Sequence, residues 1–275
     1  MDNYNSENIS CYFISGTGRC GTMLLSRALS LGTNSQCSHE RSVSTHVMKD
    51  AYYSGNYSKL HDEIDCNIVP TVAGSNANGK SYGECSAHLY FLFEELYRRF
   101  GKHTRLGLLV RRPDEFVRSA LARGFFYPEH PNALEHLRPN PDSTAGKEWD
   151  RMLPYEKCLW YWDMVNSHIL SVFENIPKQY SRVIRMEDIN ADNLLDLIEF
   201  FGIKGVSHNQ VAQLLEKRVN ATPGEAGNSE DNPWSTKMSF PKINDWTPAH
   251  RVSAQRWLSH VAYDLYPELN GLLRR

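Results

Sequence analysis

The sequence predicts an α/β fold: a single domain with a central, mainly parallel sheet flanked by helices. Short apolar runs alternate along the chain with segments whose apolar residues have helical spacing, which favours a parallel sheet. A glycine-rich loop joins the first apolar run to the first helical segment, giving a P-loop-like strand–loop–helix at the N-terminus. Because 275 residues can bury one large core, we expect one domain over residues 1–275.

The N-terminal elements follow from apolar spacing. A strand is predicted over 12–15 and a helix over 22–31, where Leu24, Leu25, Ala28 and Leu29 share one face. The polar and aromatic segment 34–67 predicts loops with short helices.

The middle of the chain predicts two more strands and two more helices. A short strand is expected over 80–84, followed by a helix whose apolar positions recur from Leu89 to Phe100. The continuous apolar run 105–110 is typical of a buried parallel strand. Pro113 then stands where a helix takes its first residue.

The C-terminal half begins with a loop over 124–146. The predicted elements after it are a helix over 148–173, a strand over 180–189, a helix over 192–201 and a final helix that Thr247 caps. The stretch 221–245 is rich in Gly, Asn, Pro and Ser, and a loop of that length in a compact domain is expected to be functional.

Composition excludes several classes of partner and location. The 30 Lys and Arg residues against 32 Asp and Glu give a net charge of -2, so no nucleic-acid groove is expected. The polar N-terminus resembles no signal peptide, and no apolar stretch is long enough to span a membrane. Six scattered cysteines without a C-x-x-C pair suit free thiols in a reducing compartment, so a cytoplasmic protein is expected. Oligomeric state stays open.

The loop "SGTGRCGT" predicts an anion site. Gly16, Gly18 and Gly21 permit positive φ and close backbone approach, and the following helix presents unpaired N–H groups. The alternative is a tight turn that binds nothing. The loop departs from the nucleotide P-loop pattern at two positions. Thr22 occupies the position of its lysine, and Met23 occupies the position of its Mg²⁺-binding hydroxyl residue. A dinucleotide fingerprint lacks the acid expected about twenty residues later.

The strand, loop and helix resemble the first motif of sulfotransferases that use 3′-phosphoadenosine 5′-phosphosulfate (PAPS). That motif has the form [KR]-[SAC]-G-T-[ST], and here it is Arg19-Cys20-Gly21-Thr22-Met23, with Met23 departing from the usual hydroxyl residue. The resemblance implies that this segment and Gly18 hold the 5′-phosphosulfate. It also implies that Arg19 faces the bridging oxygen, which gains charge during transfer.

Two further segments resemble motifs of the same family. Arg111, Pro113 and Ser119 have the spacing of the second motif, which implies that Arg111 and Ser119 bind the 3′-phosphate. The alternative is that Arg111 and Arg112 pair with neighbouring acids. The segment "PKINDWTPAHRVSAQRWL" resembles the family's C-terminal turn and last helix, so Lys237 or Lys242 is expected to close over the 3′-phosphate.

The base that takes the acceptor's proton has several candidates. "GECS" resembles a segment of some carbohydrate sulfotransferases in which the glutamate is the base, which implies Glu84, although Cys85 replaces the lysine there. His88 is the next candidate. His39 and Glu40 are rivals, because the family's acceptor pocket often draws on their loop.

The resemblance therefore implies a PAPS-dependent sulfotransferase that leaves 3′-phosphoadenosine 5′-phosphate (PAP) as product. No metal is expected if arginines and backbone amides carry the charge. The polar segment 34–67 hints at a small polar acceptor, such as a specialised metabolite or a sugar. The alternatives are a degenerate P-loop kinase and a non-catalytic nucleotide-binding module.

Overall fold

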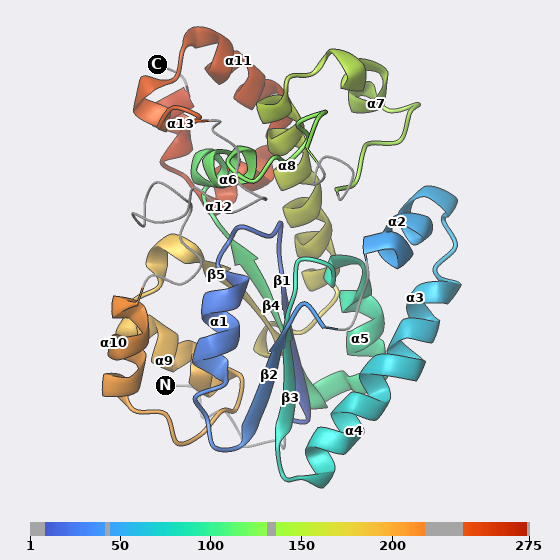
Figure 1. The fold of residues 1–275 in the computed structure, drawn as a ribbon, viewed down its shortest axis with the longest axis vertical. Coiled ribbons are helices and arrows are strands. Elements are labelled where there is room, and N and C mark those ends of the chain that lie inside the picture. Colours follow the sequence, from blue (N-terminus) through green and yellow to red (C-terminus); the bar gives the residue numbers. More distant parts are fainter. Residues whose placement is uncertain (1–8, 42–44, 131–135, 218–238, 274–275) are drawn as a thin grey trace. The chain divides into compact units, whose positions relative to one another are not determined.

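The computed structural model describes residues 9–41, 45–130, 136–217 and 239–273. Within these ranges a five-stranded sheet has the order β2-β3-β1-β4-β5, and every neighbouring pair is parallel (Figure 1). Helices flank the sheet, so the predicted α/β class is confirmed. The strands are β1 (Cys11–Ser15), β2 (Ser35–His39), β3 (Ser81–Cys85), β4 (Thr104–Val110) and β5 (Ser181–Arg185).

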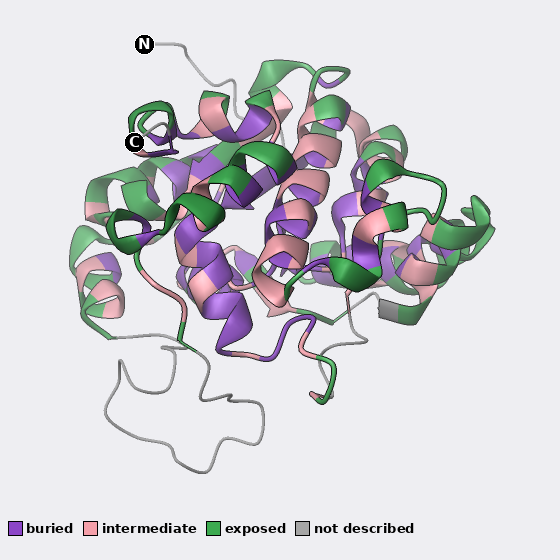
Figure 2. Ribbon diagram, turned by 90° about the horizontal axis from the view of Figure 1, so that it is seen from above, coloured by how far each residue is buried: buried purple, intermediate pink, exposed green. Residues whose placement is uncertain are grey.

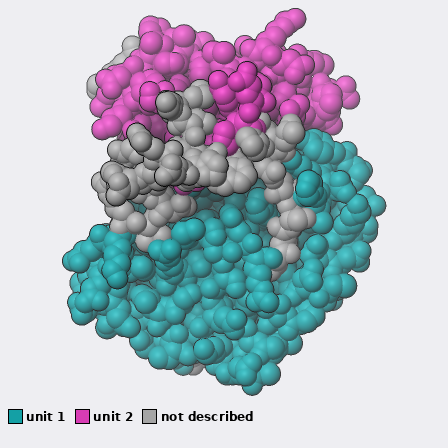
Figure 3. Space-filling view, viewed as in Figure 1, with its two compact units in different colours: residues 1–110, 168–220 teal, residues 111–167, 221–275 magenta. Residues whose placement is uncertain are grey.

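The chain groups into two compact units, each made of two separate segments (Figure 3). The first comprises residues 1–110 and 168–220 and contains the whole sheet, and the second comprises 111–167 and 221–275. That the chain forms one domain stays a prediction.

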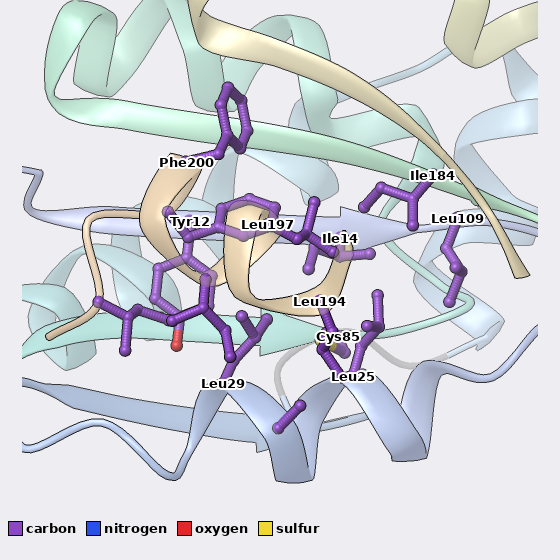
Figure 4. Packing of buried hydrophobic residues seen from close by; sticks show 14 of the residues in the cluster. Tyr12, Ile14, Leu25, Leu29, Cys85, Leu109, Ile184, Leu194, Leu197 and Phe200 are labelled. Atoms are coloured by element: carbon purple, nitrogen blue, oxygen red, sulfur yellow. The ribbon is translucent and has the colours of Figure 1, made fainter. Parts of the chain in front are cut away.

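Alternating residues of β1 build the core of the first unit on both faces of the sheet. Tyr12 and Ile14 pack against α1 (Thr22–Leu29) and α9 (Ala191–Phe200), as Figure 4 shows. On the opposite face, the ring of Phe13 lies 6.2 Å from that of Phe100 at the end of α5.

The remaining helices of the first unit lie between or after the strands. Buried residues are concentrated along the central elements, while outward helix surfaces are exposed (Figure 2). These helices are α2 (Thr45–Ser54), α3 (Ser58–Glu63), a π-helix (Ile64–Ile68), α4 (Val69–Ala77), α5 (Phe93–Phe100) and α10 (His208–Glu216), with 3₁₀ turns at Tyr90–Leu92, Gly101–His103, Lys178–Tyr180 and Met186–Asp188.

Helices build the second unit, and aromatic rings and buried polar bonds join them. Phe116 stacks on Tyr161, and the backbone N–H and hydroxyl of Ser259 both donate to Asp163. The elements are α6 (Pro113–Leu121), α7 (Thr144–Glu148), α8 (Pro154–Phe173, whose last turns belong to the first unit), α11 (Pro248–Trp257), α12 (His260–Leu265) and α13 (Leu269–Leu273), with 3₁₀ turns at Trp149–Arg151 and Ile243–Asp245.

Several predicted boundaries differ from the structure. The strand expected over 180–189 extends only from Ser181 to Arg185, and the helix expected from Leu89 begins at Phe93 after a 3₁₀ turn. The helix expected over 148–173 is divided, because α7 ends at Glu148 and α8 begins only at Pro154. The final helix begins at Pro248 with Thr247 as its cap, as predicted, but it breaks at Leu258 because Ser259 caps a new helix. The segment 34–67 contains the unpredicted strand β2, which pairs with β3.

The helices of the described ranges include none with both the length and the apolar character that crossing a bilayer requires.

Candidate functional site

The loop between β1 and α1 has the backbone shape expected of an anion cradle. Gly18 (φ 71°), Arg19 (φ 54°) and Gly21 (φ 101°) are all left-handed, and such turns form concavities lined by N–H groups. Gly16 lies against β4, where a Cβ would come within 2.1 Å of the Leu109 carbonyl oxygen. The loop therefore requires glycine at 16, 18 and 21 for separate steric reasons.

Arg19 is the only non-glycine residue of this loop with a left-handed backbone conformation. A non-glycine residue in this region costs of order 1–3 kcal/mol, and such strain is often found at ligand sites. The residue is half-buried. The sequence-based assignment of Arg19 to an anion site is consistent with this conformation.

Helix α1 begins directly after the loop, with Gly21 as its N-cap. Glycine supplies no capping side chain, and residues 22–24 carry no acid, so the first-turn N–H groups and the positive end of the helix dipole favour an anion. A Cβ on Gly21 would lie 2.5 Å from the sulfur of Met186, which closes the loop from the side of β5.

Thr22, the first residue of α1, bonds to the end of β2. Its Oγ1 lies 3.0 Å from Nε2 of His39, and Nδ1 of His39 lies 3.9 Å from a carboxylate oxygen of Glu40. Glu40 is itself left-handed, with φ 50°. The structure thus brings together three residues that the sequence analysis named, Thr22, His39 and Glu40.

Glu84, near the end of β3, is completely buried. The hydroxyl of Tyr82 donates to its Oε2 at 2.8 Å, and the backbone N–H of Arg41 donates to its Oε1 at 3.1 Å. The backbone N–H of Glu40 also donates to the carbonyl of Cys85. The end of β3 therefore holds the turn at residues 39–41.

His88 lies on the segment that follows β3, and this segment is bonded to the end of β1. The hydroxyl of Ser15 donates to the carbonyl of Ser86 at 2.7 Å, and the Ser86 hydroxyl accepts from the His88 backbone N–H. A Cβ built on Gly18 would lie 3.2 Å from the Cβ of Ala87. Ala87 thus lies against the glycine loop, and His88 is the residue that follows it.

The second unit carries Arg111, which lies just before α6, and Ser119, which lies within α6. Arg111 donates to Glu115 at 3.1 Å, and Arg118 donates to the other oxygen of Glu115 at 2.9 Å. Arg112 forms two bonds to the buried Asp114. The pairing of these arginines with neighbouring acids, which the sequence left open, is therefore present. Ser119 is buried.

The remaining predicted residues belong to the C-terminal segment. Lys242 is exposed and precedes the 3₁₀ turn Ile243–Asp245. Lys237 lies outside the described residues, as does most of the loop 221–245. Arg19 belongs to the first unit and Arg111 to the second, and their binding of a single ligand stays a prediction.

Two site residues were missed from the sequence. Tyr82 could have been found, because residues two apart on a strand share a face and Glu84 follows at that spacing. Met186 could not have been found, because no sequence pattern marks it. It lies in the turn after β5, and only the order of the strands brings this turn to the glycine loop. In the described part of the chain, no three His, Cys, Asp or Glu side chains gather as a metal site.

Comparisons with known proteins gave similarity in structure only. No family model and no curated protein matched the sequence. Among solved structures, mouse sulfotransferase SULT7A1 complexed with PAP aligns over 98% of this chain and 88% of its own, with 14% identity and a TM-score of 0.52. A sulfotransferase from Alicyclobacillus acidocaldarius aligns over 96% of this chain and 98% of its own, with 15% identity and a TM-score of 0.46. The mouse alignment, at 14% identity, shows the fold alone: this chain has the α/β fold of that sulfotransferase.

Proposed function

We propose that this protein is a sulfotransferase that moves a sulfuryl group from PAPS to a hydroxyl or amine of a small polar acceptor. The observation that carries the proposal is the glycine loop with a left-handed Arg19 at the N-terminus of α1. The fold shared with a sulfotransferase whose structure contains PAP supports it.

In the proposed reaction, the acceptor oxygen or nitrogen attacks sulfur while the bond from sulfur to the bridging oxygen breaks and PAP leaves. By analogy with phosphoryl transfer, positioning and charge stabilisation supply most of the acceleration. The loop amides and Thr22 hold the 5′ end, and Arg19 stabilises the negative charge that develops on the bridging oxygen.

The 3′-phosphate is assigned to Arg111 and Ser119. Arg111 follows the last residue of β4, and β4 pairs in parallel with β1, which leads into the glycine loop. A phosphate dianion competes well for a guanidinium, because it accepts two parallel N–H bonds. We therefore expect the bound 3′-phosphate to replace Glu115 as the hydrogen-bond partner of Arg111.

The proton acceptor is proposed to be Glu84, with His88 and His39 as the alternatives. Glu84 is a buried carboxylate beside the turn at 39–41. His88 follows the segment that contacts Gly18, and His39 bonds to Thr22. All three belong to the first unit, at the end of the sheet where the glycine loop begins.

Calorimetry with PAP and ADP, followed by a transfer assay, tests the proposed function. We expect tighter binding of PAP than of ADP, and PAP release from PAPS that EDTA does not inhibit. A degenerate P-loop kinase would instead turn over ATP with Mg²⁺. A binding module would bind PAP and yet transfer nothing to any of a panel of hydroxyl and amine acceptors.

Replacing Arg111 with alanine is expected to remove the preference for PAP over ADP. Losing a charge-assisted bidentate contact should weaken PAP binding by roughly a hundredfold and leave ADP binding nearly unchanged. Arg118→Ala is the matched control, because Arg118 bonds to the same Glu115. Equal loss of PAP affinity in both variants would contradict the assignment of the 3′-phosphate to Arg111.

A further inference from the structure

Two cysteine sulfurs lie close together on the neighbouring strands β2 and β3. Sγ of Cys37 on β2 and Sγ of Cys85 on β3 are 3.8 Å apart. In the strand register Cys37 pairs with Gly83, two residues before Cys85, so both thiols are on the same face of the sheet. The ring of Tyr12 packs against Gly83 on this face, where a Cβ would lie 2.0 Å from the ring.

The two thiols differ in access to solvent. Cys85 is completely buried, whereas Cys37 is half-buried on β2, an edge strand of the sheet. Burial raises the pKa of the Cys85 thiol, because the thiolate would lose its hydration. An oxidant therefore reaches Cys37 first, and Cys85 is the thiol placed to react with the oxidised product.

We propose that Cys37 and Cys85 form a reversible intramolecular disulfide on exposure to hydrogen peroxide. The Cys37 sulfur attacks a peroxide oxygen, giving a sulfenic acid and one water, and the Cys85 sulfur then displaces a second water as the S–S bond forms. Two thiols and one peroxide thus yield one disulfide and two waters. A dithiol such as dithiothreitol reverses the reaction by thiol–disulfide exchange.

In the strand register Cys37 and Cys85 are diagonal neighbours, whose Cα atoms lie roughly 7–8 Å apart, so the disulfide requires the backbone of β2 to move. A disulfide bond is about 2.0 Å long, so the sulfurs must approach by roughly 1.8 Å. Within the described sheet β2 pairs with β3 alone, so its end can shift without breaking a second ladder.

The disulfide would also act on the candidate site, a consequence that rests on the proposed function. Cys37 is two residues before His39, and Cys85 directly follows Glu84. Drawing the strands together changes the bond from His39 to Thr22 and the bond from Arg41 to Glu84. We expect the oxidised protein to bind PAP more weakly than the reduced protein.

Mass spectrometry of the full chain tests the disulfide without any activity assay. After peroxide treatment and blocking of the denatured chain with N-ethylmaleimide, we expect two fewer maleimide adducts than in the reduced control and a crosslinked peptide joining residues 37 and 85, both reversed by dithiothreitol. Cys66→Ser, which removes an exposed thiol, should leave the crosslink intact. Cys37→Ser and Cys37→Ala should both abolish it while melting as the unmodified chain does.

Other oxidation products would overturn the proposal. These are a crosslink through Cys20, a dimer linked through Cys66, or conversion of Cys37 to sulfinic acid without any S–S bond. If the crosslink forms but the protein fails to bind PAP even when reduced, the disulfide stands and the proposed function fails.

Discussion

Replacing Arg19 with glycine is expected to abolish sulfuryl transfer and to leave the protein folded. Removing one preorganised positive group from the bridging oxygen should lower kcat by on the order of a hundredfold to a thousandfold. Glycine adopts the left-handed conformation of residue 19 without strain, which offsets its greater entropy in the unfolded chain. The free energy of unfolding should therefore change by less than about 1 kcal/mol.

The measurement is PAP release from PAPS, together with a thermal or urea melt of the same sample. Arg27→Ala is the control, because it removes an exposed arginine from the last turn of the same helix. It should retain full turnover. Near-normal turnover in Arg19→Gly would show that the guanidinium does not act on the leaving group.

The elements that the sequence predicted well are those whose own residues carry the pattern. The strands β1 and β4 are mostly apolar and are buried along their whole length. The strand β2 was missed because Ser35–His39 contains no apolar run and buries only its first residue, and it exists through hydrogen bonds to β3. The start of helix α8 was predicted too early. The apolar spacing continues through the residues before Pro154, but the helix itself begins only at Pro154.

The candidate site divides in the same way. The spacing of Gly16, Gly18 and Gly21 predicted the loop, since the requirement for glycine is local. The bond from His39 to Thr22 depends on β2 and α1 lying side by side, which no local pattern reports. The residue types of the site could therefore be predicted from the sequence, whereas their contacts with one another depend on the order of the strands.

Replacing Glu84 with glutamine is expected to lower turnover by on the order of a hundredfold or more while PAP binding is kept. Glutamine can preserve both buried bonds, because its oxygen can accept from the Arg41 N–H and its amide can donate to the Tyr82 hydroxyl, which either donates or accepts. The variant therefore removes the base and retains the turn at 39–41.

Alanine at position 84 separates the chemical role from a structural one. It removes the carboxylate that accepts from the Arg41 N–H and the Tyr82 hydroxyl, which should destabilise the fold by about 1–3 kcal/mol. A base predicts loss of turnover in both variants. A residue that only supports the turn predicts normal turnover with glutamine and loss with alanine, and that result would move the proton acceptor to His88 or His39.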